Sequence, residues 1–402
     1  MACIEGNSIK IKVSAPGKLI LFGEHSVVYG RTALAASINR RTSLELCENV
    51  ENRITITMNK IDLNLSLNFS DIVQLVKENV PLMENNSDFS IKLIDHDSFT
   101  RLTLERISRV VDVSNLTDQQ KSSLLVFVFL LHLIFHNNSD LLQPFNIVIN
   151  SDLSLGAGTG SSASYCVCVS AALLHYRTLR TSCEFDKTNF THEDYKIINE
   201  YAYAGERILH GKPSGLDNTI CVNGSFVEMN RIGPKEFNVI ENPPLINLIL
   251  INSGVPRNTS QLVQKVAALK NRNPSAVDNI LNAMDDVSKT ASDLLKKIGA
   301  SQKSCTSFEE DFQRLEELIV MNQGLLYSLG VSHRCLDDIC MICNQQGLNA
   351  KLTGAGGGGF AFTVLPPNFD QGKLNTCLES LKSHGYHCSH VVLGGDGVCI
   401  DS

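Results

Sequence analysis

The sequence predicts a two-domain protein of the mixed α/β (α+β) class, and three observations lead to this prediction. The chain has 402 residues, more than the roughly 250–300 residues that one hydrophobic core usually serves. The first half opens with strand patterns and then places a strand, a glycine loop and a helix in succession. The second half runs strand, helices, strand, strand, helix, strand, which is typical of a split βαβ sandwich. We place the boundary near residues 232–243, giving domains 1–235 and 236–402.

Composition excludes several classes of protein. The net charge is −7 and the Lys and Arg residues are dispersed, which argues against a nucleic-acid partner. The longest apolar run, residues 124–135, is shorter than the roughly 20 residues of a membrane span, and the first residues lack the pattern of a secretory signal. The 13 cysteines are scattered, as expected for reduced thiols. We therefore expect a cytoplasmic protein without a membrane or nucleic-acid partner, whose anionic ligands are held by a local site.

The first informative stretch is residues 9–30, which we interpret as two strands broken at residues 15–17. Lys18 follows this break and could present its ammonium group to a cleft. Glu24 and His25 follow Gly23 and could hydrogen-bond a hydroxylated or carboxylated substrate. Taken singly, each of the three also fits an ordinary surface lysine or an internally satisfied polar group.

Strand character continues beyond this stretch, and then the pattern changes. Residues 65–117 are polar and rich in Asn, so we predict a surface insertion there. Thr117 is expected to cap a helix that runs to about residue 136. The predicted strands on either side of this region are 33–38, 42–47, 54–58 and 145–149.

A glycine loop follows the last of these strands. Gly156, Gly158 and Gly160 alternate with small residues, and Ser161 and Ser162 precede an apolar helix at 163–174. Glycines let the backbone approach an anion closely, and the positive end of a helix dipole favours phosphate. The competing interpretation is a flexible turn in which a serine caps the helix.

The next helix starts at a capping box, 191–194, and ends near Gly211. It places Glu206 and His210 one turn apart. A Pro/Gly loop then leads to a β-like stretch at 219–229, and Asp217 in this loop could act as a general base. An Asx turn is the alternative role for Asp217.

The second half contains another glycine run, 354–359, between two predicted strands. A dinucleotide-binding fingerprint needs a helix after the glycines, so we reject that interpretation, and neither glycine run is a Walker loop. If the first loop holds a triphosphate, a lysine from elsewhere must assist, and Lys18 is the candidate. The predicted strands are 246–252, 350–353, 360–364 and 389–393, and the helices are 255–297, 308–327, 332–345 and 371–384.

Three stretches together resemble one known family. They are PGKLILFGEH (16–25), GAGTGSSA (156–163) and KLTGAGGGG (351–359), and they are similar in order and separation to the signature motifs of the galactokinase, homoserine kinase, mevalonate kinase and phosphomevalonate kinase (GHMP) superfamily. Residues 205–218 and 255–259 resemble the branch that phosphorylates mevalonate. The resemblance covers nearly the whole chain, least well at 60–120 and 178–195.

The resemblance implies a fold and an activity. The fold would combine an N-terminal domain like domain 2 of ribosomal protein S5 with a ferredoxin-like C-terminal domain. The activity would be ATP-dependent phosphorylation of the 5-hydroxyl of (R)-mevalonate, giving 5-phosphomevalonate for isoprenoid and sterol synthesis. A homodimer and feedback inhibition by prenyl diphosphates at the ATP site would accompany it.

The matched positions also imply roles for individual residues. Asp217 would take the substrate proton, with Lys18 beside it, while Ser162 and Glu206 would hold Mg²⁺. Glu24 and His25 would face mevalonate. The nucleotide would be contacted by Lys18, Asn59, Ser151, Gly156, Ala157, Gly158, Thr159, Gly160, Ser161 and Ser162. Thr159 departs from the Leu common in the family's loop, which puts packing and nucleotide affinity in question.

Other functions remain as alternatives. A phosphomevalonate kinase or diphosphomevalonate decarboxylase would need more cationic groups for its phosphorylated substrate than Lys18, Arg207 and Arg257 offer. Galactokinase is a further alternative, but its first motif resembles one with Arg at the position of Lys18. A catalytically silent nucleotide-binding regulator would be expected to lose Lys18, Glu206 or Asp217, all of which are present.

Overall fold

A computed structural model describes residues 8–78, 83–85, 91–93, 96–154, 156, 158–182, 188–211, 213–230 and 236–401. The strands are β1 Lys10–Phe22, β2 Ala33–Glu48, β3 Arg53–Met58, β4 Leu63–Asn68, β5 Met83–Asn85, β6 Ile91–Leu93, β7 Phe145–Ser151, β8 Phe226–Asn230, β9 Glu236–Val239, β10 Ile246–Asn252, β11 Ala350–Leu352, β12 Phe360–Val364, β13 His387–Leu393 and β14 Cys399–Ile400. The helices are α1 Phe69–Lys77, α2 His96–Ile107, α3 Asp118–Phe135, α4 Ser161–Ser182, α5 His192–His210, α6 Leu216–Asn223, α7 Thr259–Arg272, α8 Pro274–Ser304, α9 Glu309–Ser328, α10 Arg334–Gln345 and α11 Gln371–Ser383, with short 3₁₀ helices η1 Ser26–Tyr29, η2 Asn59–Ile61 and η3 Ser139–Leu141.

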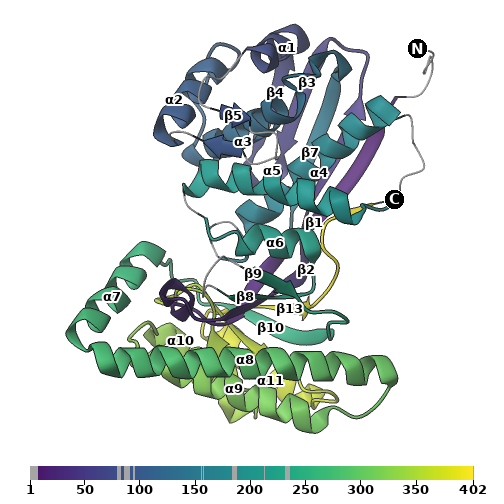
Figure 1. Cartoon of the computed structure of the whole chain (residues 1–402). Helices are drawn as coiled ribbons and strands as arrows, with labels where there is room; N and C mark the ends of the chain where they lie inside the picture. Colours follow the sequence, from purple (N-terminus) through teal and green to yellow (C-terminus); the bar gives the residue numbers. More distant parts are fainter. Residues whose placement is uncertain are drawn as a thin grey trace.

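A single sheet connects the two halves of the molecule. Within the described residues it has twelve strands, with the path β11-β12-β10-β13-β2-β7-β3-β4 and with β1, β8, β9 and β14 attached beside it. The long strand β2 pairs with β1 along most of its length, with β8 and β13 near its start, and with β7 near its end. The β1–β2 ladder therefore extends from the upper, helix-covered half of Figure 1 into the lower half.

The N-terminal half buries its sheet under helices. α4 packs on β1 and β2, and α3 and α5 pack on α4. Every residue of α3 from Leu124 to Phe135 is buried, because an apolar run of this length has no polar face to leave in water. This core fixes the strand β7, the loop after it and the start of α4, which together form the first glycine motif.

The C-terminal half has the predicted ferredoxin-like order. Its strands lie side by side as β11-β12-β10-β13, all antiparallel. In chain order, helices follow β10 and β12, and β11 leads directly into β12 through the second glycine run, as the sequence pattern predicts. The long helices α8 and α9 pack against each other across this half (Figure 1). The fold class predicted from the sequence is confirmed.

The expectation of two strands at 9–30 is wrong, because β1 continues through residues 15–17. Its register with β2 shifts between Pro16 and Gly17, and such an irregularity accommodates a proline that cannot donate a ladder hydrogen bond. Gly17 does not form a turn but allows the glycine loop to lie close to β1, because a Cβ at this position would lie 2.7 Å from the carbonyl oxygen of Thr159. Lys18 is therefore a residue within a strand.

Two further elements differ from the predictions. The predicted β-like stretch at 219–229 is the helix α6, ended by Gly224, followed by β8. Its β-branched residues are buried against neighbouring elements, and this packing overrides their strand preference. The predicted long helix after residue 255 is two helices, because Pro274 cannot continue α7 and instead starts α8.

The predicted surface insertion at 65–117 is wrong in its described parts. Ile72, Leu75 and Val76 of α1, with Ile107 of α2, belong to the N-terminal core. Their apolar spacing was masked by polar neighbours on the outer faces. Residues 79–82, 86–90 and 94–95 of this region lie outside the described residues, as do residues 231–235 near the predicted domain boundary, which stays a prediction.

Both predicted helix caps are confirmed. The side chains of Thr117 and Thr191 each accept a hydrogen bond from the backbone N–H three residues on, and the side chain of that residue accepts one from the backbone N–H of the threonine. Gly211 ends α5. In the described part of the chain, no helix is both long enough and apolar enough to cross a lipid bilayer.

Candidate active site

A cleft of about 880 Å³ opens where β1, the first glycine loop, α5, α6 and the second glycine run meet. Its wall brings together most of the residues singled out in the sequence. These are Lys18, Glu24, His25, Ser151, Gly156, Gly158, Gly160, Ser161, Ser162, Glu206 and Asp217. Ala157 lies outside the described residues, and Asn59 and Thr159 are not part of this wall.

Lys18 and Asp217 form an ion pair inside the cleft. The Lys18 Nζ lies 3.0 Å from Oδ2 of Asp217; the Lys18 side chain is only 6% exposed, whereas that of Asp217 is 34% exposed. Lys18 projects from β1, and its backbone N–H donates to the Thr159 carbonyl at 2.9 Å. Asp217 lies in the first turn of α6. The pair thus presents a cation and a proton acceptor together at the end of the glycine loop.

The glycine loop has the conformation that its sequence requires. Gly156, Gly158 and Gly160 all have left-handed φ angles, between 67° and 79°, which side chains with a Cβ rarely adopt. α4 begins immediately afterwards at Ser161, so free backbone N–H groups and the positive end of the helix dipole face the loop. A Cβ at Gly160 would lie 2.7 Å from Cγ of Lys18, so this glycine also makes room for the lysine.

Thr159 is turned away from the cleft. Its side chain is buried, and its hydroxyl donates to the Ser154 carbonyl at 3.4 Å. The departure from the family's usual Leu therefore changes packing beneath the loop and leaves the lining of the cleft as it is.

Ser162 and Glu206 lie together at the end of the cleft. Burial, followed by repulsion from Asp217, raises the pKa of Glu206 to about 7, while hydrogen bonds from Ser162 and Cys166 and the charge of Lys18 oppose this rise. His210 Nε2 lies 3.2 Å from the Ser162 hydroxyl. A buried carboxylate and a hydroxyl are oxygen ligands of the kind that Mg²⁺ prefers.

The acidic groups of the cleft fit a metal held partly by the substrate. Among the residues that the structure describes, no group of three or more His, Cys, Asp or Glu side chains is arranged to hold a metal ion. Mg²⁺ is commonly bound by one or two protein ligands together with waters and substrate phosphates. Ser162 and Glu206 fit that mode, whereas a closed, all-protein cage is excluded among these residues.

His25 is held in an unusual backbone conformation. Its φ is 59°, a left-handed value that costs about 1–3 kcal/mol for a residue with a Cβ. Its ring Nε2 lies 2.8 Å from the Ala355 carbonyl oxygen, which can only accept, so Nε2 carries the hydrogen and Nδ1 is an acceptor when the ring is neutral. Burial lowers the pKa of His25 below its ordinary value, which favours that neutral form.

The structure corrects the expected position of Glu24. The residue contributes to the wall of the cleft, but its side chain is fully buried and is paired with Lys351, and its Oε2 accepts from Asn322 at 3.1 Å. The carboxylate is therefore committed to partners in the C-terminal half, although the residue lines the cleft. The sequence motif could not show this, because both partners lie far along the chain.

Ser151 and Asn59, the two predicted nucleotide contacts outside the glycine loop, differ in access to the cleft. The Ser151 hydroxyl lies 2.9 Å from that of Thr42 on the wall of the cleft. Asn59 is exposed at the start of η2, where it donates to Asn150 at 2.6 Å. Its neighbour Lys60 lines the cleft instead.

Arg257, named above only as a cation available to a phosphorylated substrate, lines the cleft. Its guanidinium lies between the two glycine runs: a Cβ at Gly158 would lie 1.5 Å from one terminal nitrogen, and a Cβ at Gly354 would lie 2.6 Å from the other. It also donates to the Thr353 carbonyl at 3.3 Å. Two glycines thus leave the space for one arginine, a relationship that only the fold reveals.

Comparison with known proteins gives matches over nearly the whole chain. Residues 125–225 match the family described as GHMP kinases N terminal domain, and residues 303–387 match GHMP kinases C terminal. Mevalonate kinase of Homo sapiens is 34% identical over 403 residues, covering 97% of this chain and 94% of that protein. Mevalonate kinase of Arabidopsis thaliana is 34% identical over 398 residues, covering 98% of this chain and 100% of that protein.

Solved structures share the fold at lower sequence identity. The Methanococcus jannaschii mevalonate kinase has a TM-score of 0.65 and 22% identity, covering 98% of this chain and 100% of that chain. The L. major mevalonate kinase in complex with R-mevalonate has a TM-score of 0.65 and 21% identity, covering 99% of this chain and 100% of that chain. The two-domain architecture is therefore shared with both.

Proposed function

Because the chain belongs to the mevalonate kinase family of GHMP kinases, we propose that it transfers the γ-phosphoryl group of ATP to the 5-hydroxyl of (R)-mevalonate. The product would be 5-phosphomevalonate, for isoprenoid and sterol synthesis. The observation that carries the proposal is the Lys18–Asp217 pair, with 3.0 Å between Nζ and Oδ2, at the end of a phosphate-compatible glycine loop.

The transfer is an in-line displacement in which positioning and charge neutralisation matter most. The substrate oxygen forms a bond to the γ-phosphorus while the bond from that phosphorus to the β,γ-bridging oxygen breaks. The hydroxyl proton passes to a carboxylate oxygen of Asp217, acting as general base. The Lys18 ammonium, fixed by β1, stabilises the negative charge that shifts onto the phosphoryl oxygens.

The nucleotide would lie along the first glycine loop. The loop N–H groups and the N-terminus of α4 would bind its phosphates, and Ser151 on the cleft wall would contact the rest of the nucleotide. Asn59 keeps its proposed role as a contact at the outer edge. Arg257 adds a second cation between the two glycine runs, where it would hold the transferred group.

Ser162 and Glu206 would hold Mg²⁺, and Glu206 must be ionised to do so. When bound, the ion would neutralise charge on the phosphate oxygens. The support for this assignment is the buried carboxylate beside a hydroxyl, with Asp217 close enough to raise the pKa of Glu206.

On the acceptor side, His25 is proposed to contact mevalonate through its free Nδ1. Glu24 is withdrawn from that role, because its carboxylate is paired with Lys351. The phosphorylated substrates of other GHMP members would call for additional cations at this end. The cations near Asp217 in the cleft wall, Lys18 and Arg257, are already engaged with the phosphoryl group in this proposal.

The test is ADP release with Mg·ATP and a panel of mevalonate, phosphomevalonate, diphosphomevalonate, galactose and homoserine, with Asp217→Asn as the control variant. Turnover on mevalonate that is lost in the variant is the expected result. Turnover only on a phosphorylated compound would overturn the substrate assignment, and silence on the whole panel would favour a nucleotide-binding regulator.

Feedback by prenyl diphosphates forms part of the proposal. A diphosphate matches the glycine loop, and apolar residues such as Met58, Ile61 and Ile149 line the adjoining wall, where a prenyl tail could lie. Inhibition by farnesyl diphosphate should be competitive with ATP and not with mevalonate. Inhibition competitive with mevalonate would contradict this placement.

A homodimer and a cytosolic location also form part of the proposal. Val320, Met321 and Tyr327 of α9 are each at least half exposed, and a second copy could cover them. Sedimentation over a dilution series should detect a dimer. The described cysteines are free thiols, as in reducing compartments, and a fluorescent fusion would report the location.

A further inference from the structure

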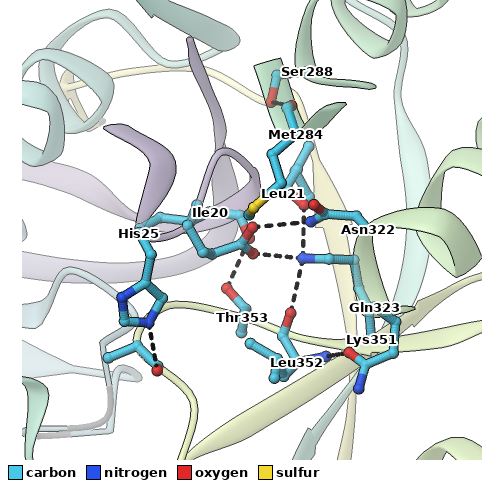
Figure 2. A network of polar contacts seen from close by, with 12 residues as sticks. Ile20, Leu21, His25, Met284, Ser288, Asn322, Gln323, Lys351, Leu352 and Thr353 are labelled. Atoms are coloured by element: carbon cyan, nitrogen blue, oxygen red, sulfur yellow. Dashed lines mark hydrogen bonds and ion pairs between the residues drawn. The ribbon is translucent and has the colours of Figure 1, made fainter. Parts of the chain in front are cut away.

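Lys351 is a fully buried lysine with three polar partners. Its side chain is 0% exposed, and its Nζ donates to the carbonyl oxygens of Leu21 and Leu352, each at 2.8 Å, and to Glu24. The ammonium group also lies 5.7 Å and 5.1 Å from the ring centres of Phe22 and Phe362. Figure 2 shows this network around the ammonium nitrogen.

Glu24 is held equally tightly on the other side of the pair. One carboxylate oxygen accepts from Lys351 and the other accepts from Asn322 of α9. Glu24 is the residue directly before His25. The pair therefore joins the segment that presents His25 to two elements of the C-terminal half, β11 and α9.

The two segments that meet here are connected at several points. Lys351 binds Leu21 and Glu24, the Thr353 hydroxyl donates to the Ile20 carbonyl at 2.7 Å, and the Ala355 carbonyl accepts from His25 (Figure 2). Residues 20–25 are thus joined to residues 351–355 by several side-chain contacts. Lys18 lies just before one segment, and the second glycine run lies within the other.

Stability alone does not account for this pair. Removing two charges from water offsets most of their mutual attraction, and apolar side chains of similar size often stabilise a protein as well or better. A buried ion pair does, however, fix the direction of the groups that it joins. Here the joined group is a strained histidine that lines the cleft.

We propose that Lys351 is a positioning residue for the phosphoryl acceptor: through Glu24 and the Leu21 carbonyl it holds His25 in place on the acceptor side of the cleft. This inference rests on the proposed function for the identity of the acceptor. Lys351 has no contact with the cleft itself and acts only through these neighbours. The nucleotide end, built on β7 and α4, lies outside the network.

The inference predicts different effects on the Michaelis constant for mevalonate and on the affinity for the nucleotide. Without the ammonium, residues 20–25 lose the contacts of Leu21 and Glu24 with Lys351 and keep only those of Ile20 with Thr353 and of His25 with Ala355, so His25 is held less firmly in its positive-φ conformation. Misplacement of a substrate-positioning group by about 1 Å can lower activity by up to about 100-fold. The Michaelis constant for mevalonate should therefore rise while nucleotide affinity is retained.

The experiment compares Lys351→Met with the double variant Glu24→Gln/Lys351→Met. The double variant guards against misfolding, because it leaves no uncompensated carboxylate in the interior. Leu381→Ala in α11 is the matched control, since it removes a fully buried side chain of the same half away from the cleft. For each protein we would measure the KM for mevalonate, the Kd of a fluorescent ATP analogue and the melting temperature. We would also measure the amide exchange of the two segments, residues 20–25 and 351–355.

The expected result for the Lys351 variants is a KM for mevalonate about tenfold higher or more, with the nucleotide Kd changed by less than about twofold. Amide exchange in both segments should become faster. Leu381→Ala should lower the melting temperature and leave both constants unchanged.

Two results would overturn the inference. One is a lower melting temperature with an unchanged KM for mevalonate, which is what a purely structural role would give. The other is an equal rise in the nucleotide Kd. If the wild-type protein does not phosphorylate mevalonate, the proposed function fails, but the exchange data still decide whether Lys351 fixes the two segments.

Discussion

The ammonium nitrogen of Lys18 lies 3.0 Å from a carboxylate oxygen of Asp217, although one residue belongs to the first strand and the other to a helix in the middle of the chain. Neither residue could take the other's place. β1 fixes the cation beneath the glycine loop, whereas the first turn of α6 leaves the carboxylate partly exposed to the cleft. This asymmetry supports the proposed division of roles, in which Asp217 accepts the proton and Lys18 stabilises charge.

Replacing Asp217 by Asn should remove the general base and retain the fold. The amide oxygen can still accept from Lys18, so we expect little change in melting temperature. A positioned base contributes about 10²–10⁴-fold to the rate, and kcat should fall by that factor. Steady-state kinetics and a thermal melt check both parts. Near-normal turnover in this variant would contradict the assigned mechanism.

Lys18→Met should lower kcat by about 10²–10³-fold, as is typical when one preorganised stabilising group is lost. Because Lys18 and Asp217 act as a unit, the double variant Lys18→Met/Asp217→Asn should be nearly as slow as the slower single variant. A double-mutant cycle measures this coupling. Full additivity of the two effects would argue that the pair does not act together.

Glu206 should make the metal-free protein less stable as pH rises. Its pKa in the folded protein is raised from 4.5 to about 7, so the folded state retains a proton that the unfolded chain releases. The stabilisation is fully present below about pH 4.5 and is lost between pH 4.5 and 7. The total effect is of order 3 kcal/mol.

Glu206→Gln is the matched comparison, because it keeps the shape of the side chain and removes its titration. In EDTA, the variant and the wild type should melt alike near pH 4, and the variant should be the more stable one at pH 8. Parallel melting curves across this range would show that Glu206 titrates near its ordinary value.

Gly158→Ala should harm the site more than Gly156→Ala. Both positions have a left-handed φ, so both substitutions carry a similar backbone cost, about 1 kcal/mol. Only at Gly158 would the new Cβ collide with the Arg257 guanidinium, whereas Gly156 has open space around it. We expect a larger loss of kcat for Gly158→Ala, measured at saturating ATP. Equal losses would show that Arg257 has no part in turnover.

Much of the site could be predicted because it is encoded locally. Alternating glycines before an apolar helix specify the phosphate loop, and Thr117 and Thr191 with their partners three residues on specify two helix starts. In these cases the residues that matter lie within one or two turns of each other. Lys18 and Asp217 were found because short motifs surround each of them.

The parts that could not be predicted depend on distant partners. Glu24 meets Lys351, 327 positions away in the chain, and a carboxylate beside a cleft motif is indistinguishable from a substrate ligand until that partner is known. The position of Arg257 between the two glycine runs could not be predicted for the same reason, since its space is created by glycines in two separate loops. In α6, burial outweighed the strand preference of individual residues.

The shared strand β1 also decides whether the protein can be divided. Leu19, Leu21 and Phe22 pack in one hydrophobic cluster with Leu248 and Phe362 from the C-terminal half, whereas Val13 and Ala15 of the same strand belong to the N-terminal core. A fragment that ends before residue 236 would expose the former group to water. The N-terminal half thus carries part of the interior of the C-terminal half, and separate expression of the N-terminal half would yield an aggregation-prone chain.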